Sequence, residues 1–122
     1  MKEVIAIIRP KKIGATRDAL EQLGFPSMTA TAVSGRGLQR GIAKEVTPHV
    51  QVKGIAGRAG GMKYVPKRLL SIVVRNDDVD VVVKAIIDVN QTAQIGDGKI
   101  FVCPVDDALR VRTGEKSESA VL

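Results

Sequence analysis

Residues 95–99, with the sequence Ile-Gly-Asp-Gly-Lys, have the composition best suited to binding an anion. Gly96 and Gly98 permit backbone conformations in which neighbouring amides point toward one anion, and Lys99 directly follows them. Their spacing differs from that of a Walker loop, and a strand rather than a helix is expected after Lys99. A phosphate-binding turn and an ordinary tight turn with a solvated lysine are both compatible with these residues.

Arg110 and Arg112 form a second candidate anion site. Residues two apart on a strand project from the same face, so both guanidinium groups would point the same way. That arrangement suits a polyphosphate, and it equally suits solvated cations on an edge strand.

Positive charge and glycine concentrate in residues 34–68, which hold eight cations, one anion and seven of the twelve glycines. The net charge of this segment is +7, whereas the rest of the chain has eleven cations against twelve anions. Residues 35–41 open no helix, which disfavours a dinucleotide fingerprint, and residues 57–60 lack the flanking helices of a KH clamp. The sequence predicts a long, flexible basic loop with its flanks on an electrically balanced body.

Candidate catalytic groups are scarce. His49 is the single histidine and Cys103 the single cysteine, so neither a His cluster nor a multi-cysteine metal site is expected. We interpret His49 as a loop residue, Cys103 as a strand-core residue, and the adjacent Asp106 and Asp107 as a solvated turn. The sequence predicts a binding protein rather than an enzyme.

The elements that must position these residues follow the order strand, helix, strand, long loop, strand, helix, strand. Alternating or continuous apolar runs indicate the strands, and apolar residues at helical spacing indicate the helices, the second being the clearer. Asn76, Asp77 and Asp78 suit a turn and an N-cap before that helix. The predicted elements are residues 4–8, 11–23, 28–33, 69–74, 79–87 and 99–103.

This order predicts an α+β fold, a ferredoxin-like split β-α-β sandwich (βαββαβ) with both helices on one face of an antiparallel sheet. Three of the strands are almost continuously apolar, so the open face must be covered, and self-association is the simplest cover. The few aromatic residues, Phe25, Tyr64 and Phe101, provide no stacking platform for RNA. The sequence therefore disfavours a nucleic-acid partner.

The chain has 122 residues, a mass of 13.0 kDa and a net charge of +6. This size predicts one domain over residues 1–122, ending in a polar tail over residues 113–122. No apolar run approaches the ~20 residues of a membrane span, and no signal-peptide pattern precedes the first strand, so a cytoplasmic protein without membrane insertion is expected.

Taken together, these segments resemble the PII family of nitrogen signal-transduction proteins over residues 2–115. The resemblance is carried by residues 6–10 (AIIRP), 35–41 (GRGLQRG), 92–102 (TAQIGDGKIFV) and 110–115 (RVRTGE). The long middle segment and residues 65–74 (VPKRLLSIVV) are most similar to the NifI subgroup, whose genes lie in nitrogenase operons.

The resemblance implies a homotrimer, or a hetero-oligomer with a paralogous subunit, that binds ATP or ADP between subunits. It implies 2-oxoglutarate binding by Gln39, Lys67, Gly37 and Gly96, with Gln39 also holding Mg²⁺ through ATP. The implied nucleotide-binding residues are Ile7, Thr29, Gly35, Arg36, Gly37, Leu38, Gln39, Val73, Ile95, Gly96, Asp97, Gly98, Lys99, Arg110 and Arg112.

The resemblance further implies a sensor whose basic segment, the T-loop of the family, binds a nitrogenase component protein and inhibits it when nitrogen is plentiful. Arg36 and Leu38 stand where the family usually has aromatic and basic residues, and Ala93 and Gln94 replace a usual Gly-Lys. Tyr64 lies at the base of the loop, so control by uridylylation is not expected. Two alternatives are a PII-type regulator of another target, such as an ammonium channel or biosynthetic enzyme, and a nucleic-acid-binding module.

Overall fold

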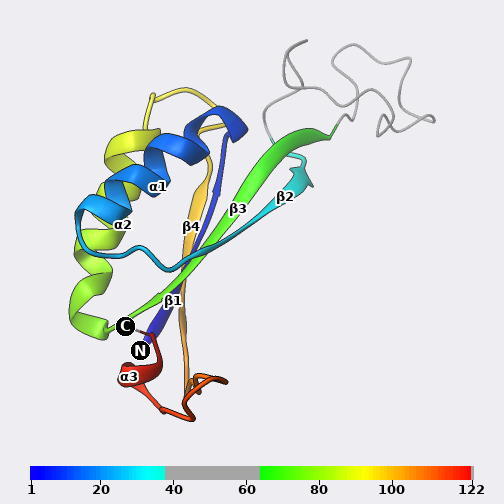
Figure 1. The fold of residues 1–122 in the computed structure, drawn as a ribbon. Helices are drawn as coiled ribbons and strands as arrows, with labels where there is room; N and C mark the ends of the chain where they lie inside the picture. Colours follow the sequence, from blue (N-terminus) through cyan, green and yellow to red (C-terminus); the bar gives the residue numbers. More distant parts are fainter. Residues whose placement is uncertain (38–63, 122) are drawn as a thin grey trace.

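The computed structural model describes residues 1–37 and 64–121, which form a sheet, two helices that cover it and a short C-terminal extension (Figure 1). Short 3₁₀ turns, η1 and η4, precede the two longer helices. The elements in chain order are β1 (Lys2–Ile8), η1 (Pro10–Lys12), α1 (Ile13–Gln22), β2 (Thr29–Gly35), β3 (Val65–Val74), η4 (Asn76–Asp78), α2 (Val79–Asn90), β4 (Lys99–Pro104) and α3 (Glu118–Val121).

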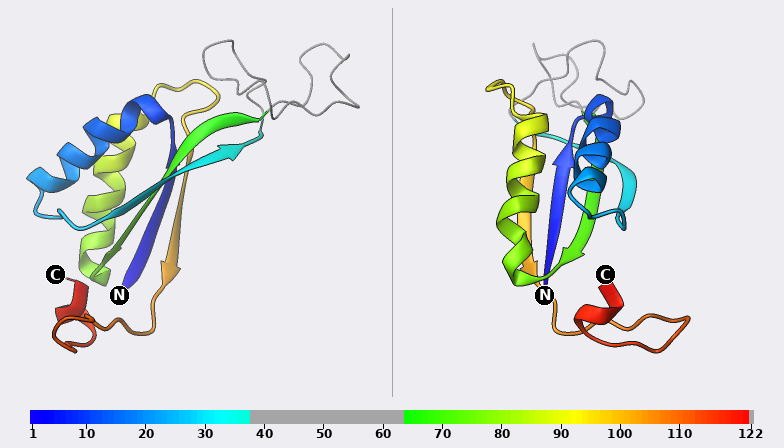
Figure 2. Two further views of the ribbon diagram at one scale, coloured as in Figure 1. Left: turned by 45° about the vertical axis from the view of Figure 1, so that its right-hand side comes forward. Right: turned by 60° about the vertical axis from the view of Figure 1, so that its left-hand side comes forward.

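The four strands form one antiparallel sheet in the order β2-β3-β1-β4. The register places Ala6 of β1 between Leu70 of β3 and Ile100 of β4. Helices α1 and α2 lie side by side on one face of this sheet, and in the described part of the chain the other face carries no helix (Figure 2). The predicted ferredoxin-like α+β fold is confirmed.

The core lies between the helices and the sheet. Alternation along a strand sends every second side chain to the same face, so the residues that β1 and β3 contribute to this core are all at even positions. Removing each Val, Leu or Ile side chain of this core from water contributes about 1.5–3 kcal/mol. The core residues are Val4, Ala6, Ile8, Leu20, Leu70, Ile72, Val74, Val82 and Ile86.

The second helix owes its stability to burial, because its many β-branched residues have modest helix propensity. Val82 and Ile86 are fully buried, and Val79 and Val83 pack against the core. The sequence places Ile87 in the same apolar stripe, but its side chain is 41% exposed, so the buried stripe is narrower than expected.

The opposite face of the sheet is also apolar. By register it presents Ile5 and Ile7 of β1, Val73 of β3, and Phe101 and Cys103 of β4. Phe101 is 48% exposed there. Cys103 thus lies on a strand as predicted, but on the face away from the helix-covered core.

The strands that flank the long loop extend further than the sequence predicts. Pairing of Gly35 with Val65 continues β2 and β3 beyond Ile8, the last residue of β1. This extension is a two-stranded ribbon, and Pro66 is tolerated in it because β1 no longer requires an amide donor there. The ends of the predicted loop segment are therefore strand.

Candidate ligand-binding site

The predicted phosphate turn joins α2 to β4 and depends on its glycines. Gly96 has a φ of 102° and Gly98 a φ of 115°, in the region that glycine adopts readily. A Cβ on Gly98 would lie 1.9 Å from the Ile7 carbonyl oxygen, so the turn packs directly on β1. The sequence correctly predicts that both glycines have backbone conformations that other residues rarely adopt. The structure adds that there is no room for a side chain at Gly98.

Asp97 closes this turn with its carboxylate. The backbone amides of Thr92 and Ala93 donate to Asp97 Oδ2 at 2.7 and 2.9 Å, and the Thr92 hydroxyl donates to Oδ1. The bonds from Thr92, followed by those from Arg9 and Ala93, hold the pKa of the Asp97 carboxyl well below its ordinary value. The resemblance implies that Asp97 contacts a nucleotide, and the structure shows that its carboxylate also organises the turn.

Two cations, one directly after β1 and one in β3, brace the same turn. Arg9 Nη1 donates to Asp97 Oδ1 at 2.6 Å and Arg9 Nη2 to the Ile95 carbonyl at 3.0 Å. Lys67 Nζ donates to the Gly96 carbonyl at 2.7 Å. Both cations are only 8% exposed.

Lys67 was expected to bind a 2-oxoglutarate carboxylate, and the structure gives it a partner in the turn. Because Lys67 belongs to the ribbon at the base of the long segment, its bond joins that ribbon to the turn. Sequence reasoning missed Arg9 as a second brace. The sequence does contain a signal for this ion pair, because an arginine directly follows a buried strand and an aspartate lies between two glycines.

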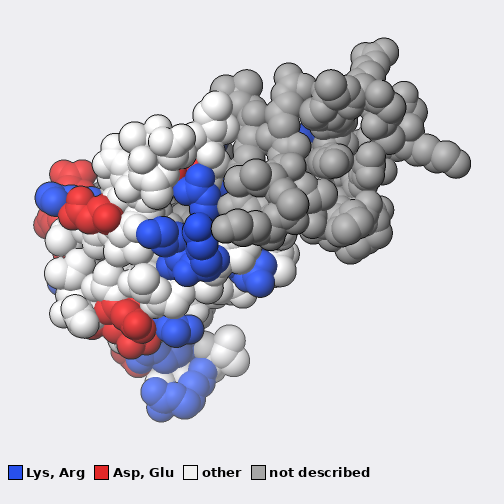
Figure 3. Space-filling view, turned by 90° about the horizontal axis from the view of Figure 1, so that it is seen from above, with Lys and Arg blue, Asp and Glu red and all other residues white. Residues whose placement is uncertain are grey.

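Basic side chains surround this end of the molecule. Seen from above, one group of Lys and Arg side chains lies near the middle of the view, and others lie toward the left and lower edges beside acidic side chains (Figure 3). Lys99 is exposed and begins β4 opposite Ile7. This concentration of positive charge attracts anionic ligands.

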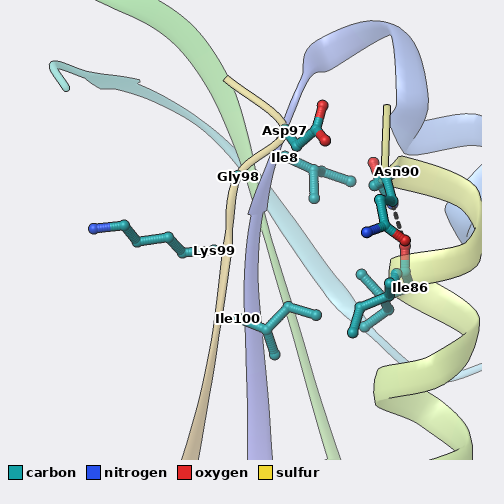
Figure 4. A pocket seen from close by; sticks show the side chains of 9 residues that line it. Ile8, Ile86, Asn90, Asp97, Gly98, Lys99 and Ile100 are labelled. Carbon is teal, nitrogen blue, oxygen red and sulfur yellow. Dashed lines mark hydrogen bonds between the residues drawn. The ribbon is translucent and has the colours of Figure 1, made fainter. Parts of the chain in front are cut away.

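A pocket of about 350 Å³ lies between the end of α2 and the start of β4, beneath the turn. Its walls include Ile8, Ile86 and Ile100, whereas the Lys99 side chain points away from it across β4 (Figure 4). Asn90, also in the wall, donates to the Ile86 carbonyl at 2.8 Å and to the Thr16 hydroxyl at 2.9 Å. This pocket is a mainly apolar support for the turn, and the Lys99 ammonium is available on the other side.

A second group of predicted residues lies elsewhere. Thr29, Val73 and Arg110 line one pocket of about 560 Å³, together with Ala120 and Val121 of the C-terminal tail. A neutral wall with one guanidinium suits a base or sugar joined to a phosphate.

Arg110 and Arg112 do not share a strand face, and that prediction is wrong. Residues 111–113 form a turn, and Leu109 bridges to Lys116 after the chain reverses at Gly114, whose φ is 73°. Arg110 is partly buried beside the pocket and Arg112 is exposed.

The two groups occupy opposite ends of the sheet within one chain. At the end near the turn, Ile7 pairs with both Leu69 and Lys99. At the end near the pocket, Val73 pairs with Glu3. Four strand positions between Leu69 and Val73 correspond to about 13 Å. One chain therefore carries the turn group, residues 95–99, at one end of the sheet. It carries the pocket group, Thr29, Val73 and Arg110, at the other end.

The remaining predicted residues lie at the base of the long segment. Arg36 and Gly37 are exposed, and the Arg36 guanidinium stands over the Tyr64 ring at 5.9 Å. Leu38 and Gln39, and with them the predicted Mg²⁺ contact, lie outside the described residues. Within residues 1–37 and 64–121 no three His, Cys, Asp or Glu side chains form a metal-binding group, and no helix of this part could span a membrane.

Comparisons with known proteins show to which family the chain is similar. The family described as Nitrogen regulatory protein P-II matches residues 1–115. "Nitrogen fixation nifHD region GlnB-like protein 2" of Methanobacterium ivanovii is 57% identical over 122 residues, covering 100% of both chains. "Nitrogen fixation nifHD1 region GlnB-like protein 2" of Methanosarcina barkeri is 58% identical over 122 residues, 99% of each chain. A solved structure, "Crystal Structure of Arabidopsis thaliana PII bound to citrate", has a TM-score of 0.73 at 36% identity and covers 98% of this chain and 88% of that one.

Proposed function

Since the chain belongs to the PII family of nitrogen regulatory proteins, we propose that it senses nitrogen status by binding ATP or ADP and 2-oxoglutarate, and that it regulates nitrogenase by direct contact. The observation that carries this proposal is the bond from Lys67 to the Gly96 carbonyl. It connects the ribbon at the base of the long basic segment to the predicted phosphate turn, so ligands at the turn can influence that segment.

The nucleotide would bind between subunits of a homotrimer or of an assembly with a paralogous subunit. The exposed Lys99 and the turn of Gly96 and Gly98 would meet the phosphates from one chain. Thr29 and Val73 would meet the base from a neighbouring chain, and Arg110 and Arg112 of that chain the phosphates. The separation of these groups within one chain supports this arrangement, as does the apolar sheet face, on which residues 1–37 and 64–121 place no helix.

The effector would act at the base of the long segment. 2-Oxoglutarate would bind through Gln39, Lys67 and the backbone of Gly37 and Gly96, with Mg²⁺ held by ATP and Gln39. Lys67 would then exchange the Gly96 carbonyl for a ligand carboxylate. Citrate, to which the Arabidopsis protein is bound in its crystal structure, is likewise a carboxylate.

Regulation of nitrogenase is supported by the names of the relatives, which place them in nitrogen-fixation nifHD regions. The segment of residues 34–68 carries a net charge of +7, which suits contact with an acidic protein surface. Ordering of this segment by 2-oxoglutarate would release nitrogenase, and loss of 2-oxoglutarate when nitrogen is plentiful would restore inhibition. The protein would act in the cytoplasm and would be a regulator, not an enzyme.

Calorimetric titration with Mg-ATP, with and without saturating 2-oxoglutarate, tests the sensor. We expect ATP to bind and 2-oxoglutarate to strengthen its binding. The Gln39→Ala variant should bind ATP without the 2-oxoglutarate response; a retained response would contradict the proposed effector site.

The target requires a second assay. The purified protein should inhibit nitrogenase, and 2-oxoglutarate with ATP should relieve the inhibition. A protein that binds both ligands but leaves nitrogenase fully active would be a PII-type regulator of another target.

A further inference from the structure

The C-terminal tail already holds the arginine to which we assign a phosphate contact. Arg110 Nη1 donates to Glu115 Oε1 at 2.7 Å, and Arg110 Nη2 donates to the Ser119 carbonyl at 3.0 Å. The side chains of Arg110 and Glu115 are 28% and 43% exposed. Both terminal nitrogens of the guanidinium are therefore engaged by the chain itself.

Several bonds place Glu115 against Arg110. The amide of Arg110 donates to the Glu115 carbonyl at 2.8 Å, and the amide of Gly114 donates to the Arg110 carbonyl at 2.7 Å. The Thr113 hydroxyl donates to Glu115 Oε1 at 2.8 Å. These contacts fix the carboxylate where it meets the guanidinium.

The same tail also reaches the pocket. After Ser117, whose amide donates to the Ala108 carbonyl at 2.9 Å, the chain forms α3. Ala120 and Val121 then form one wall of the pocket that contains Thr29 and Val73. One short segment thus contacts the pocket and the arginine beside it.

We propose that residues 113–121 are an internal competitor for the nucleotide, with Glu115 occupying Arg110 in place of a phosphate. A carboxylate and a phosphate oxygen use the same donors of an arginine. Two anions at one guanidinium also repel each other, so binding must displace Glu115. Glu115 is then a specificity-determining residue that lowers affinity in proportion to the negative charge placed at Arg110.

This inference rests on the proposed nucleotide binding, and the experiment separates the two. Binding of Mg-ATP, Mg-ADP and adenosine is measured by calorimetry for the wild type and for Glu115→Gln, with Glu118→Gln as a control that changes an exposed carboxylate in the same tail. Glu115→Gln should bind ATP about fivefold to tenfold more tightly, as expected for removal of a partly exposed like charge. Adenosine affinity should not change, because adenosine brings no anion to Arg110.

A double-mutant cycle tests whether Glu115 acts through Arg110. In the Arg110→Ala background, Glu115→Gln should leave ATP affinity unchanged. An unchanged or lower ATP affinity of Glu115→Gln, or an equal gain for adenosine, would overturn the inference while the nucleotide site stands. Absence of ATP binding in the wild type and in every variant would overturn both proposals.

Discussion

Gly98 shows how one residue fixes the position of the phosphate turn. Any side chain there meets the Ile7 carbonyl, and the backbone has a left-handed φ as well. The contact arises from the close packing of the turn on β1. Gly24, with a φ of 94° and no atom within 4 Å of the place where a Cβ would lie, has the backbone conformation without the contact.

The Gly98→Ala variant should lose about 2 kcal/mol or more of folding free energy, since φ strain alone costs about 1–2 kcal/mol and the contact adds to it. Gly24→Ala is the matched control and should lose only the strain. Urea unfolding of both variants gives the comparison. Equal losses would show that the turn moves away from Ile7 without cost.

Asp97 links the turn to acid stability. Its folded-state pKa lies below the unfolded value, so it stabilises the fold above the unfolded pKa, and this contribution is lost as pH falls through the folded pKa. Wild-type stability should therefore fall below about pH 4, the ordinary aspartate range. Asp97→Asn should flatten this fall.

Urea midpoints measured between about pH 2 and pH 6 test the Asp97 prediction. Asp80→Asn, which removes an exposed carboxylate in the first turn of α2, measures the effect of losing one surface charge. A pH profile of Asp97→Asn that matches the wild type would contradict the assigned role.

Lys99 is the exposed cation nearest in sequence to the turn. We expect Lys99→Ala to weaken ATP binding by about 1.5–3 kcal/mol, the range for a hydrogen bond to a charged group. Lys84→Ala is the control, because Lys84 is an exposed lysine that pairs with Asp88 on α2 at 2.8 Å. If calorimetry gives Lys99→Ala the same ATP affinity as the wild type, Lys99 does not contact ATP.

At the scale of elements, the ribbon of β2 and β3 is the connection between turn and loop. It carries Lys67, which is paired with Val33 and whose ammonium donates to the Gly96 carbonyl. In the proposed mechanism the ribbon has two arrangements, one with Lys67 bound to the Gly96 carbonyl and one with Lys67 bound to a ligand carboxylate. A ligand with different affinity for them shifts their populations.

We expect Lys67→Ala to retain ATP binding but lose its strengthening by 2-oxoglutarate, because the carboxylate partner is gone. Titration of ATP with and without 2-oxoglutarate measures this response. Lys11→Ala, an exposed lysine in η1, is the charge-matched control and should respond as the wild type does. A full response in Lys67→Ala would contradict a role for Lys67 in effector binding.

At the scale of the whole molecule, the described residues leave the sheet with one face covered by helices and one open face. The open face carries Ile5, Val73 and the half-exposed Phe101, and an apolar sheet face of this kind marks an interaction surface. In the proposed assembly, further copies would cover this face, and we expect the pocket group of one chain to lie near the turn group of another. Assembly and nucleotide binding are therefore expected to depend on each other.

The Phe101→Asp variant should dissociate the assembly. Burial of the Phe101 side chain in an apolar contact contributes about 1.5–3 kcal/mol to association, whereas burial of an aspartate charge in the same contact is unfavourable. Sedimentation equilibrium gives the mass. Val81→Asp places the same charge on α2, where Val81 is 41% exposed, and should leave the mass unchanged. Phe101→Asp with the wild-type mass would show that this face is not the interface.

The sequence by itself determined the order of elements, the single-sheet fold and the glycine turn. Each is encoded locally, because apolar periodicity specifies strand or helix and glycine specifies unusual backbone angles. The tertiary structure decided which distant groups meet. Arg9 meets Asp97 and Lys67 meets Gly96 because strand register brings one end of β1 and β3 to the turn, and no local pattern encodes register. The placement of Arg110 against Glu115 likewise depends on how the tail folds back, which is why its predicted strand was wrong.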